Sequence, residues 1–260
     1  MDRREFLYRS ASFLAGSLWG IGSFSNAVAF GGPRNNGYSS QPRIALIIDD
    51  IGQSLSAARQ FIDLGAPITF SILPQLAHSY ELAMDIHDKG QEVMLHQPME
   101  PHNSGLDPGP GALYVGYATE MIFGIMEENV SKVPFALGIN NHMGSKFTEC
   151  EKEMDEVLHV VRKRGLFFID SLTSSRSMGY HSAKRLHMST GHRDIFLDDF
   201  VNEPDIFCQL NKLEEHAQRY GHAIGIGHPF PETARAIRQF IREGKDRSFS
   251  LVHVSSLLYV

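Results

Sequence analysis

The chain has 260 residues, of which 42% are hydrophobic, which is enough apolar material for one sizeable core or at most two small ones. Charged residues make up 21% of the sequence and the net charge is −6, which argues against nucleic acid as a partner, because nucleic-acid binding needs a basic face. The two cysteines, Cys150 and Cys208, fit no metal-binding spacing and are too few for a disulfide framework. Whether they pair or remain separate thiols stays open.

Residues 1–29 have the pattern of an export signal, with a basic start, an apolar middle and an A-x-A end. Arg3 and Arg4 lie within R-R-E-F-L, which resembles the twin-arginine export signal, and an ordinary secretory signal is the alternative. The apolar run is shorter than the roughly 20 residues that a membrane span needs. We therefore expect cleavage after Ala29, no stable membrane span in the mature protein, and a periplasmic or otherwise exported location. Residues 30–42 are expected to form a flexible linker.

From Arg43 onward, short β-branched runs alternate with amphipathic segments. The first run, Arg43–Gly52, predicts a strand buried on both faces, because it is almost continuously apolar up to Asp49. Further strands are predicted at 67–73, 92–96, 135–139, 166–170, 194–197, 222–227 and 250–254. Helices are predicted from Ser54 to Gly65 and at 76–89, 120–132, 151–163, 203–220 and 231–244. This alternation predicts a single α/β domain, a (β/α) barrel of seven or eight mainly parallel strands.

Polar residues collect at the predicted carboxyl ends of the strands, where α/β folds place their functional residues. Asp49 and Asp50 end the first strand, His96 ends the third, and His142 follows the fourth. Two adjacent carboxylates are costly to ionise unless a cation lies between them. One carboxylate and two imidazoles suit zinc or another divalent first-row metal, with a position left open for water. We therefore predict that Asp50, His96 and His142 hold a divalent metal ion, with zinc as the expected ion.

Further strand-end residues complete a hydrolytic site. Asp49 is expected to take a proton from water, and His228, after the seventh strand, to protonate the leaving group. Asp170, at the end of the fifth strand, is expected to orient His228 or to fix the substrate. Asn140 and Asn141, beside the metal-binding histidine of the fourth strand, are candidate substrate-binding residues.

Several of these residues also fit a role as helix caps. Asp49 and Asp50 are an alternative N-cap pair, since acidic side chains favour the start of a helix. Asp198 and Asp199 precede another predicted helix, and there we expect only capping. His228 stands just before the last helix, and capping and catalysis are equally open for it.

Five motifs together resemble a known family: I-D-D-I-G, L-H-Q-P-M-E-P, G-I-N-N-H-M-G-S, F-F-I-D-S and I-G-I-G-H-P. They are similar to those of the divergent branch of the polysaccharide deacetylase superfamily, and the likeness covers essentially all of 43–260. The resemblance implies a distorted (β/α) barrel and metal-dependent removal of acetyl groups from N-acetylated sugars. It also implies that Asp49 is the general base, Asp50 a metal ligand and His228 the general acid.

The sequence departs from the superfamily at two motifs. The second motif of the superfamily has two histidines four residues apart, and here that spacing joins His96 to Glu100. The arginine-bearing third motif is replaced by G-I-N-N-H-M-G-S. Either His142 supplies the missing imidazole, or Glu100 takes its place as a metal ligand or supports the ligands from behind.

These observations favour an exported metal-dependent hydrolase of the carbohydrate deacetylase type, with a glycan as its substrate. The alternative is a barrel that keeps the metal or the groove but binds cell-wall glycan or a protein partner without turnover. A metal-dependent phosphoesterase is less consistent with the sequence, because a two-metal site would need additional ligands.

Overall fold

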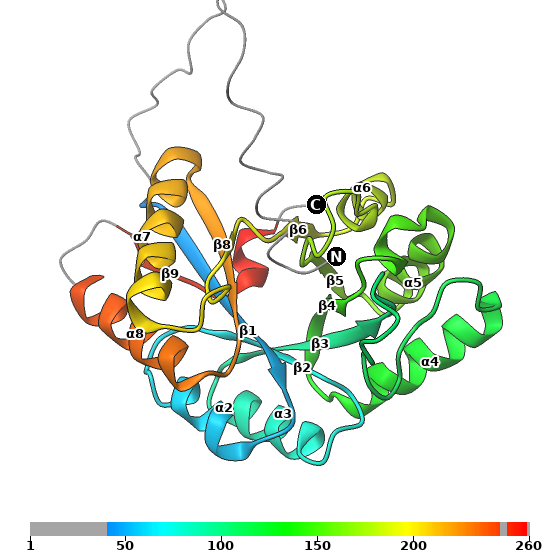
Figure 1. Cartoon of the computed structure of the whole chain (residues 1–260), viewed down its shortest axis with the longest axis horizontal. Helices are drawn as coiled ribbons and strands as arrows, with labels where there is room; N and C mark the ends of the chain where they lie inside the picture. Colours follow the sequence, from blue (N-terminus) through cyan, green and yellow to red (C-terminus); the bar gives the residue numbers. More distant parts are fainter. Residues whose placement is uncertain (1–40, 245–248, 259–260) are drawn as a thin grey trace, which may run out of the picture. The chain divides into compact units, whose positions relative to one another are not determined.

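Strand β1, Arg43–Ile51, lies inside a single parallel sheet (Figure 1). The computed structural model describes residues 41–244 and 249–258, so the predicted export signal at 1–29 and most of the linker at 30–42 lie outside the described part. Every residue from Ile44 to Ile48 is fully buried, which confirms the predicted two-faced strand.

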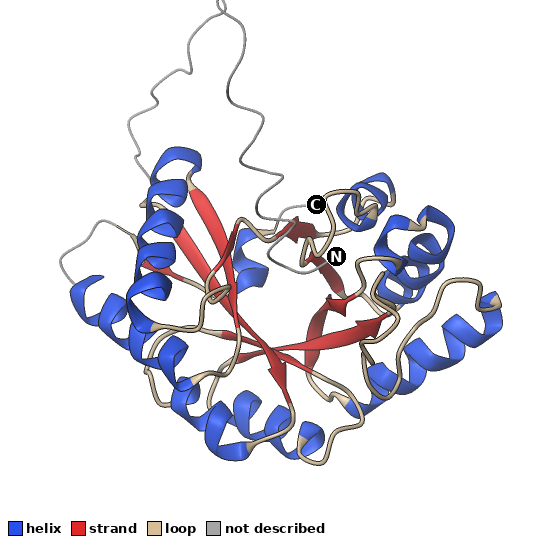
Figure 2. Cartoon of the chain, viewed as in Figure 1, coloured by secondary structure: helices blue, strands red, loops and turns tan. Residues whose placement is uncertain are grey.

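Eight strands follow one another in the order β6-β5-β4-β3-β2-β1-β8-β7, and β9 adds to β1. All paired neighbours run parallel. The strands curl into a distorted barrel with helices along its outer side, which confirms the predicted fold class (Figure 2). The remaining strands are β2 Thr69–Ile72, β3 Glu92–Met99, β4 Ala136–Met143, β5 Phe167–Asp170, β6 Thr190–His192, β7 Ile195–Phe196, β8 His222–Gly227 and β9 Ser250–Leu251.

Seven α-helices lie in the described part of the chain, and five of the predicted helices are found within a few residues of their expected bounds, with a sixth, α3, beginning later. They are α2 Leu55–Ile62, α3 Ser79–Asp88, α4 Thr119–Lys132, α5 Glu151–Lys163, α6 Gly179–Arg185, α7 Glu203–Tyr220 and α8 Pro231–Glu243. Helix α6 and strand β6 were not predicted. Two short 3-10 helices, η1 Phe147–Glu149 and η3 Val254–Leu257, complete the elements, and η3 occupies part of the segment predicted as the last strand.

Local chemistry explains where several helices begin and end. The Ser54 hydroxyl accepts a hydrogen bond from the backbone of Ala57 at 3.3 Å and caps α2, as predicted. The side chain of Asn202 caps α7 by accepting from the backbone of Asp205 at 3.0 Å. Helix α7 ends at Gly221, whose φ of 88° lies in the left-handed region that glycine adopts without strain.

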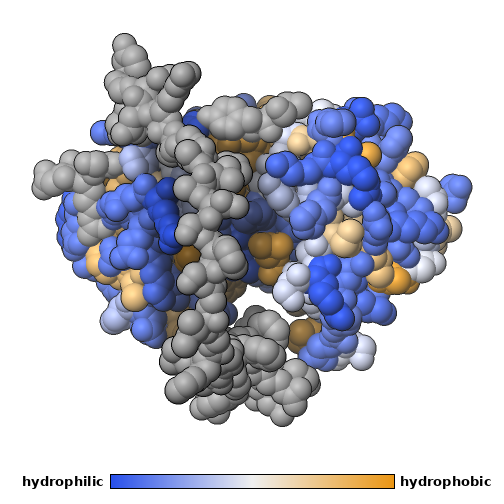
Figure 3. All heavy atoms as spheres, turned by 90° about the horizontal axis from the view of Figure 1, so that it is seen from above, coloured by the Kyte–Doolittle hydropathy of each residue, from blue (hydrophilic) through white to orange (hydrophobic). Residues whose placement is uncertain are grey.

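No helix in the described part is both long and apolar enough to cross a membrane. On the face drawn in Figure 3, hydrophobic residues of the described part are scattered among hydrophilic ones. Cys150 is half-buried and Cys208 is exposed, and both are free thiols.

The two ends of the sheet are consecutive in the chain, because only Arg193 and Asp194 separate β6 from β7. The backbone N–H of Arg193 donates to Asp170 on β5 at 3.0 Å, and that of Asp194 donates to Ile224 on β8 at 2.9 Å. A single segment therefore pairs with β5 through its first half and with β8 through its second half. This segment brings the carboxyl ends of β5 and β8 to the same opening of the barrel, the mouth.

Alternation along the strands separates two apolar clusters. On β1, Ile44, Leu46 and Ile48 belong to the large cluster that packs under the helices. Ala45 and Ile47 face the interior of the barrel, in a smaller cluster that also contains Met94, Phe167, Ile169, Ile224, Ile226, Val254 and Leu257.

Helix η3 closes the amino-terminal end of this interior. The backbone of Val254 donates to the Thr69 hydroxyl at 3.1 Å, and that hydroxyl donates to the Glu92 carboxylate at 2.9 Å. Arg43 donates to the carbonyl of Ser256 at 3.0 Å. These partners include the first residues of β1, β2 and β3, so a ligand has access to the interior from the carboxyl ends of the strands.

Because Leu257 is only 3% exposed and fills this end of the barrel, Leu257→Ala is expected to lower the free energy of unfolding by about 2–5 kcal/mol. Chemical denaturation measures the change. The control is Leu106→Ala, because Leu106 is 48% exposed and its loss should change the stability by less than about 0.5 kcal/mol. Equal effects of the two substitutions would show that η3 does not plug the barrel.

Candidate metal centre

The first feature of the site is a break in the alternation of β1. Asp49 continues the inward series of Ala45 and Ile47, so a regular strand would turn Asp50 outward. Instead, Asp50 has a φ of 58°, and the pairing of β1 with β2 shifts register between Ile48 and Ile51. A left-handed conformation costs a non-glycine residue roughly 1 kcal/mol or more, and such strain concentrates at functional sites. The break places both carboxylates at the mouth of the barrel.

His96 is held by a buried amide. It lies two residues after Met94 on the inward face of β3 and is 2% exposed. Asn140, on β4, donates from its amide nitrogen to Asp49 at 2.8 Å, so its amide oxygen faces His96 Nδ1 at 2.7 Å. Nδ1 of His96 therefore carries a proton, and Nε2 is the ring nitrogen that faces the cluster. Burial by itself lowers the pKa of His96, but the charge of Asp49 and the interactions with Asp50 and Asn140 raise it, so Nε2 gives up its proton when it ligates a cation.

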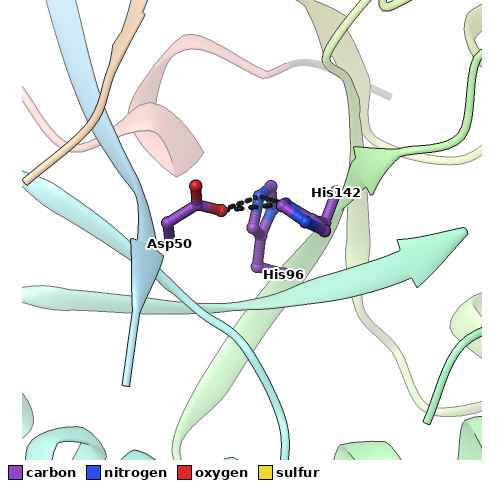
Figure 4. A group of neighbouring side chains, drawn as sticks. All are labelled: Asp50, His96 and His142. Carbon is purple, nitrogen blue, oxygen red and sulfur yellow. Dashed lines mark hydrogen bonds and ion pairs between the residues drawn. The ribbon is translucent and has the colours of Figure 1, made fainter. Parts of the chain in front are cut away.

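His142 completes a cluster of three ligand atoms. Its Nδ1 lies 2.8 Å from Oδ1 of Asp50 and 3.2 Å from Nε2 of His96. Nε2 of His96 is in turn 3.2 Å from the same Asp50 oxygen. Figure 4 shows the three side chains converging from separate strands. Sequence analysis predicted these three residues as ligands, and the fold brings them together.

The chemistry of this cluster fits a divalent metal ion. Oδ1 of Asp50 is buried and accepts no well-aligned hydrogen bond from any residue in the described part, although two ring nitrogens lie close to it. Ligands about 2.0–2.2 Å from a tetrahedral ion lie roughly 3.3 Å from one another, close to the separations found here. Burial by itself raises the pKa of Asp50, but interactions with His142 and His96 outweigh it and hold the pKa well below its usual range. The carboxylate is thus available as a charged ligand.

Asp49 lies beside the cluster and is 3% exposed. Its Oδ2 is 3.7 Å from Nε2 of His96, and its Oδ1 accepts the hydrogen bond from Asn140. Burial raises the pKa of Asp49 despite the opposing charges of His96 and His228. A carboxylate with a raised pKa accepts a proton more readily than an ordinary aspartate does.

His228 faces the cluster from β8, with its Nε2 3.9 Å from Oδ2 of Asp50. Asp198 holds the other side of the ring, because His228 Nδ1 donates to Asp198 Oδ1 at 2.9 Å. Oδ2 of Asp198 accepts from the backbone of His228 at 2.6 Å and from the Thr233 hydroxyl at 2.8 Å. Burial by itself lowers the pKa of His228, but the hydrogen bond and charge of Asp198, with the charges of Asp50 and Asp49, raise it to about 9.

The prediction that Asp198 only caps a helix is therefore wrong, since Asn202 caps α7 and Asp198 is buried against His228. The sequence carried a usable signal, because the acidic pair at 198–199 ends a strand just as Asp49 and Asp50 do. The capping alternative for His228 is also wrong, because α8 has Phe230 as its N-cap residue with no side-chain cap.

Asp170 does not orient His228. Its carboxylate accepts hydrogen bonds from the backbone of Leu172 at 2.9 Å, the Ser177 hydroxyl at 2.7 Å and the backbone of Tyr180 at 2.9 Å. These bonds fix the loop that leads into α6. The expected orienting role belongs to Asp198, because that side chain lies on the segment that pairs with β8.

The two asparagines predicted to bind substrate are buried and have internal partners. Asn140 bridges Asp49 and His96 and also accepts from the Ser71 hydroxyl. Asn141 donates to the carbonyl of Met143 at 2.8 Å and accepts from the backbone of Ser171 at 2.9 Å. Both are 1% exposed or less, and their contacts support the site, while substrate binding by them stays a prediction.

Glu100 lies outside the three-residue cluster. Its carboxylate forms an ion pair with Lys146 at 2.6 Å and accepts from the backbone of Val115 at 2.8 Å, so it holds the loop after β3. Strand β4 extends to Met143, beyond its predicted end at residue 139, and carries His142 into the mouth. Of the two alternatives for the missing imidazole, the geometry therefore favours His142.

The fold and the site together define a parallel (β/α)-barrel protein with a candidate metal centre at its carboxyl-terminal mouth. The model of the divergent polysaccharide deacetylase family matches residues 46–258. The chain therefore belongs to the divergent polysaccharide deacetylase family.

Three individual proteins illustrate what the chain is similar to. The uncharacterized protein YibQ of Escherichia coli K12 is 35% identical over 219 residues, which cover 83% of this chain and 67% of YibQ. The crystal structure of the uncharacterized protein ATU2773 from Agrobacterium tumefaciens C58 has a TM-score of 0.80 and 29% identity, covering 84% of this chain and 89% of that one. A mutant of BA3943 from Bacillus anthracis, a CE4 family pseudoenzyme with restored enzymatic activity, has a TM-score of 0.51 and 14% identity, over 85% of this chain and 68% of its own. The last comparison shows a shared fold.

If Asp198 raises the pKa of His228, then Asp198→Asn should lower that pKa from about 9 toward the ordinary 6.5. Titration of the histidine ring signals by NMR in chelator-treated protein measures the shift. A folded-state pKa above the unfolded value stabilises the fold below pH 6.5, and this contribution is lost as the pH rises through about 9. The control is Asp199→Asn, since Asp199 is the exposed neighbour, and an equal shift in both variants would contradict the pairing.

Proposed function

We propose that this protein is an exported, metal-dependent hydrolase that removes acetyl groups from N-acetylated sugars of cell-wall or related glycans. One observation carries the proposal: the ligand atoms of Asp50, His96 and His142 converge. Asp49 and His228 lie on either side of this cluster. Family membership over residues 46–258 supports it.

Each residue at the mouth has a definite role in this proposal. Asp50, His96 and His142 would hold the ion, for which we propose zinc. When bound, the ion supplies Lewis acidity at the acetyl carbonyl and lowers the pKa of water. Asp49 accepts the proton of the attacking water. Nε2 of His228 gives a proton to the departing amine.

The surroundings of these groups support the roles. The Asn140 amide keeps His96 in the tautomer that a metal ligand needs, while the Asp198 carboxylate favours the protonated ring that a general acid needs. Export, which residues 1–29 predict, would bring the protein to cell-wall glycan.

A second candidate function is binding of a glycan without turnover. It is favoured by Glu100, which stands where the second motif of the superfamily has its second histidine and which forms an ion pair with Lys146. The fold itself is compatible with either state, since BA3943 is a pseudoenzyme whose mutant has restored activity. The two functions differ in the role of Asp49 and His228, because the hydrolase needs both residues for turnover and the binding protein does not.

The metal assignment predicts that the protein binds one divalent ion, and that Asp50→Ala and His142→Ala each weaken zinc binding roughly 100-fold or more. Calorimetry with zinc, together with metal content by mass spectrometry, measures this. Glu100→Gln is the matched control, because it removes a carboxylate near the mouth that does not belong to the cluster. Loss of metal in Glu100→Gln but not in His142→Ala would reverse the choice of ligand.

The catalytic assignment predicts that Asp49→Asn and His228→Gln each lower kcat for acetate release by roughly 10²–10⁴-fold while the metal content is retained. N-acetylated oligosaccharides are the substrates, and released acetate is measured directly. A protein that binds metal but releases no acetate from any of these glycans would favour the non-catalytic function.

A further inference from the structure

One arc of the barrel mouth has no role in the proposed reaction. Strands β1, β3 and β4 supply the metal-binding cluster and Asp49, and β8 supplies His228. Between β4 and β8 lie β5 and the segment that contains β6 and β7. Two polar side chains from this arc, Ser171 and Arg193, face the same interior.

Ser171 presents a buried hydroxyl without a partner. Ile169, two residues earlier, belongs to the interior cluster, whereas the intervening Asp170 binds the loop outside. Ser171 is 6% exposed, and its Oγ forms no hydrogen bond with any residue in the described part of the chain. Leaving a buried hydroxyl unpaired is unfavourable, and an oxygen acceptor on a ligand would remove this cost.

The position of Ser171 places this hydroxyl next to the metal-binding cluster. Asn140 pairs with Ile169 between β4 and β5. Continuing that register by two residues puts Ser171 beside His142. The backbone N–H of Ser171 also donates to the side chain of Asn141 at 2.9 Å, which fixes the serine at this level.

Arg193 lies beside Ser171 at the junction of β6 and β7. A Cβ atom at Gly191 would meet Ile224 at 3.1 Å and Ile169 at 3.4 Å, so Gly191 faces the interior, and so does Arg193 two residues later. His192 points the other way and packs against Tyr180, with ring centroids 4.9 Å apart.

Backbone contacts hold the guanidinium in place. Nε of Arg193 donates to the carbonyl of Ser171 at 2.8 Å, and Nη2 donates to the carbonyl of Leu172 at 3.0 Å. The group lies over the Phe196 ring, 5.0 Å from its centroid. Within the described residues, Nη1 donates no hydrogen bond and no carboxylate forms an ion pair with Arg193. Among the carboxylates, Asp49 acts on it most strongly through its charge.

We propose that Arg193 and Ser171 form a subsite for a carboxylate carried by the ligand, beside the metal centre. A carboxylate accepts two hydrogen bonds at once, and in the part of the chain that the structure describes neither Nη1 of Arg193 nor Oγ of Ser171 has an acceptor. The positive charge of Arg193 also favours an anionic ligand over a neutral one on this side of the mouth. The inference rests on the proposed function for the identity of the ligand, which is then an acidic rather than a neutral sugar.

The test compares sugars that differ by one carboxylate, using the full chain as purified. Calorimetry measures the binding of two pairs of sugars. The first pair is N-acetylmuramic acid and N-acetylglucosamine, and the second is methyl glucuronide and methyl glucoside. Free acetate is measured as a separate ligand. Wild-type protein should bind the acidic member of each pair at least tenfold more tightly. Arg193→Gln should abolish this preference, Arg193→Lys should retain part of it, and Ser171→Ala should reduce it.

The matched control is Arg176→Gln, since the Arg176 side chain is 72% exposed and pairs with Glu149 elsewhere. It should leave the preference unchanged. If Arg193→Gln does not fold, as judged by thermal unfolding, Ser171→Ala carries the test, because it removes only one oxygen. Acetate that binds as tightly as the acidic sugars, and is lost in the same variants, would support the subsite with the released acid as the source of the carboxylate.

Two outcomes would overturn the proposal: equal binding of acidic and neutral sugars by the wild type, or equal loss of both in Arg193→Gln. The second would mean that Arg193 acts only through Asp49. A measurement of acetate release tests the proposed deacetylase activity separately from the proposed subsite. A preference for acidic sugars without acetate release keeps the subsite and rejects the deacetylase, whereas release from neutral and acidic glycans alike does the reverse.

Discussion

The site depends on one local departure from strand geometry. In a regular strand, Asp49 and Asp50 would face opposite sides of the sheet, and only one of them would reach the mouth. The left-handed backbone at Asp50 turns both carboxylates toward His96 and His142. Met143 and Leu172, just past the functional positions of β4 and β5, also have positive φ values, of 51° and 48°. Three of the six non-glycine residues with positive φ in the described part thus lie where these strands reach the mouth, and the packed sheet beneath them sustains the strain.

The two strand-end histidines that flank the carboxylates differ in the partner of their second ring nitrogen. His96 donates from Nδ1 to a neutral amide, which leaves Nε2 facing the cluster and available to a cation. Burial by itself lowers the pKa of His96, but Asp49, Asp50 and Asn140 raise it above its usual value. His228 donates to a buried carboxylate, which favours the charged ring and raises its pKa. The two rings therefore share a raised pKa but have different fixed partners, the Asn140 amide for His96 and the Asp198 carboxylate for His228.

Family membership and site geometry support the same chemistry by separate arguments. The family match covers residues 46–258 and brings the deacetylase-type barrel, while the converging ligand atoms of Asp50, His96 and His142 follow from this chain's own side chains. His142 lies on β4, so the imidazole that the second motif lacks comes from the neighbouring strand. The candidate metal centre therefore combines one residue from each of β1, β3 and β4.

Local patterns in the sequence determined most of the strands, most of the helices and most of the polar residues near the strand ends, because burial, capping and chain reversal depend on neighbouring residues. They also identified Asp50, His96 and His142, since parallel strands bring their carboxyl ends to one edge. Only the tertiary structure decided that Asp198 rather than Asp170 holds His228, because that pairing depends on β7 lying beside β8. The bridging role of Asn140 and the unpaired donors of Ser171 and Arg193 were likewise beyond the sequence, since they arise from contacts between strands that are distant along the chain.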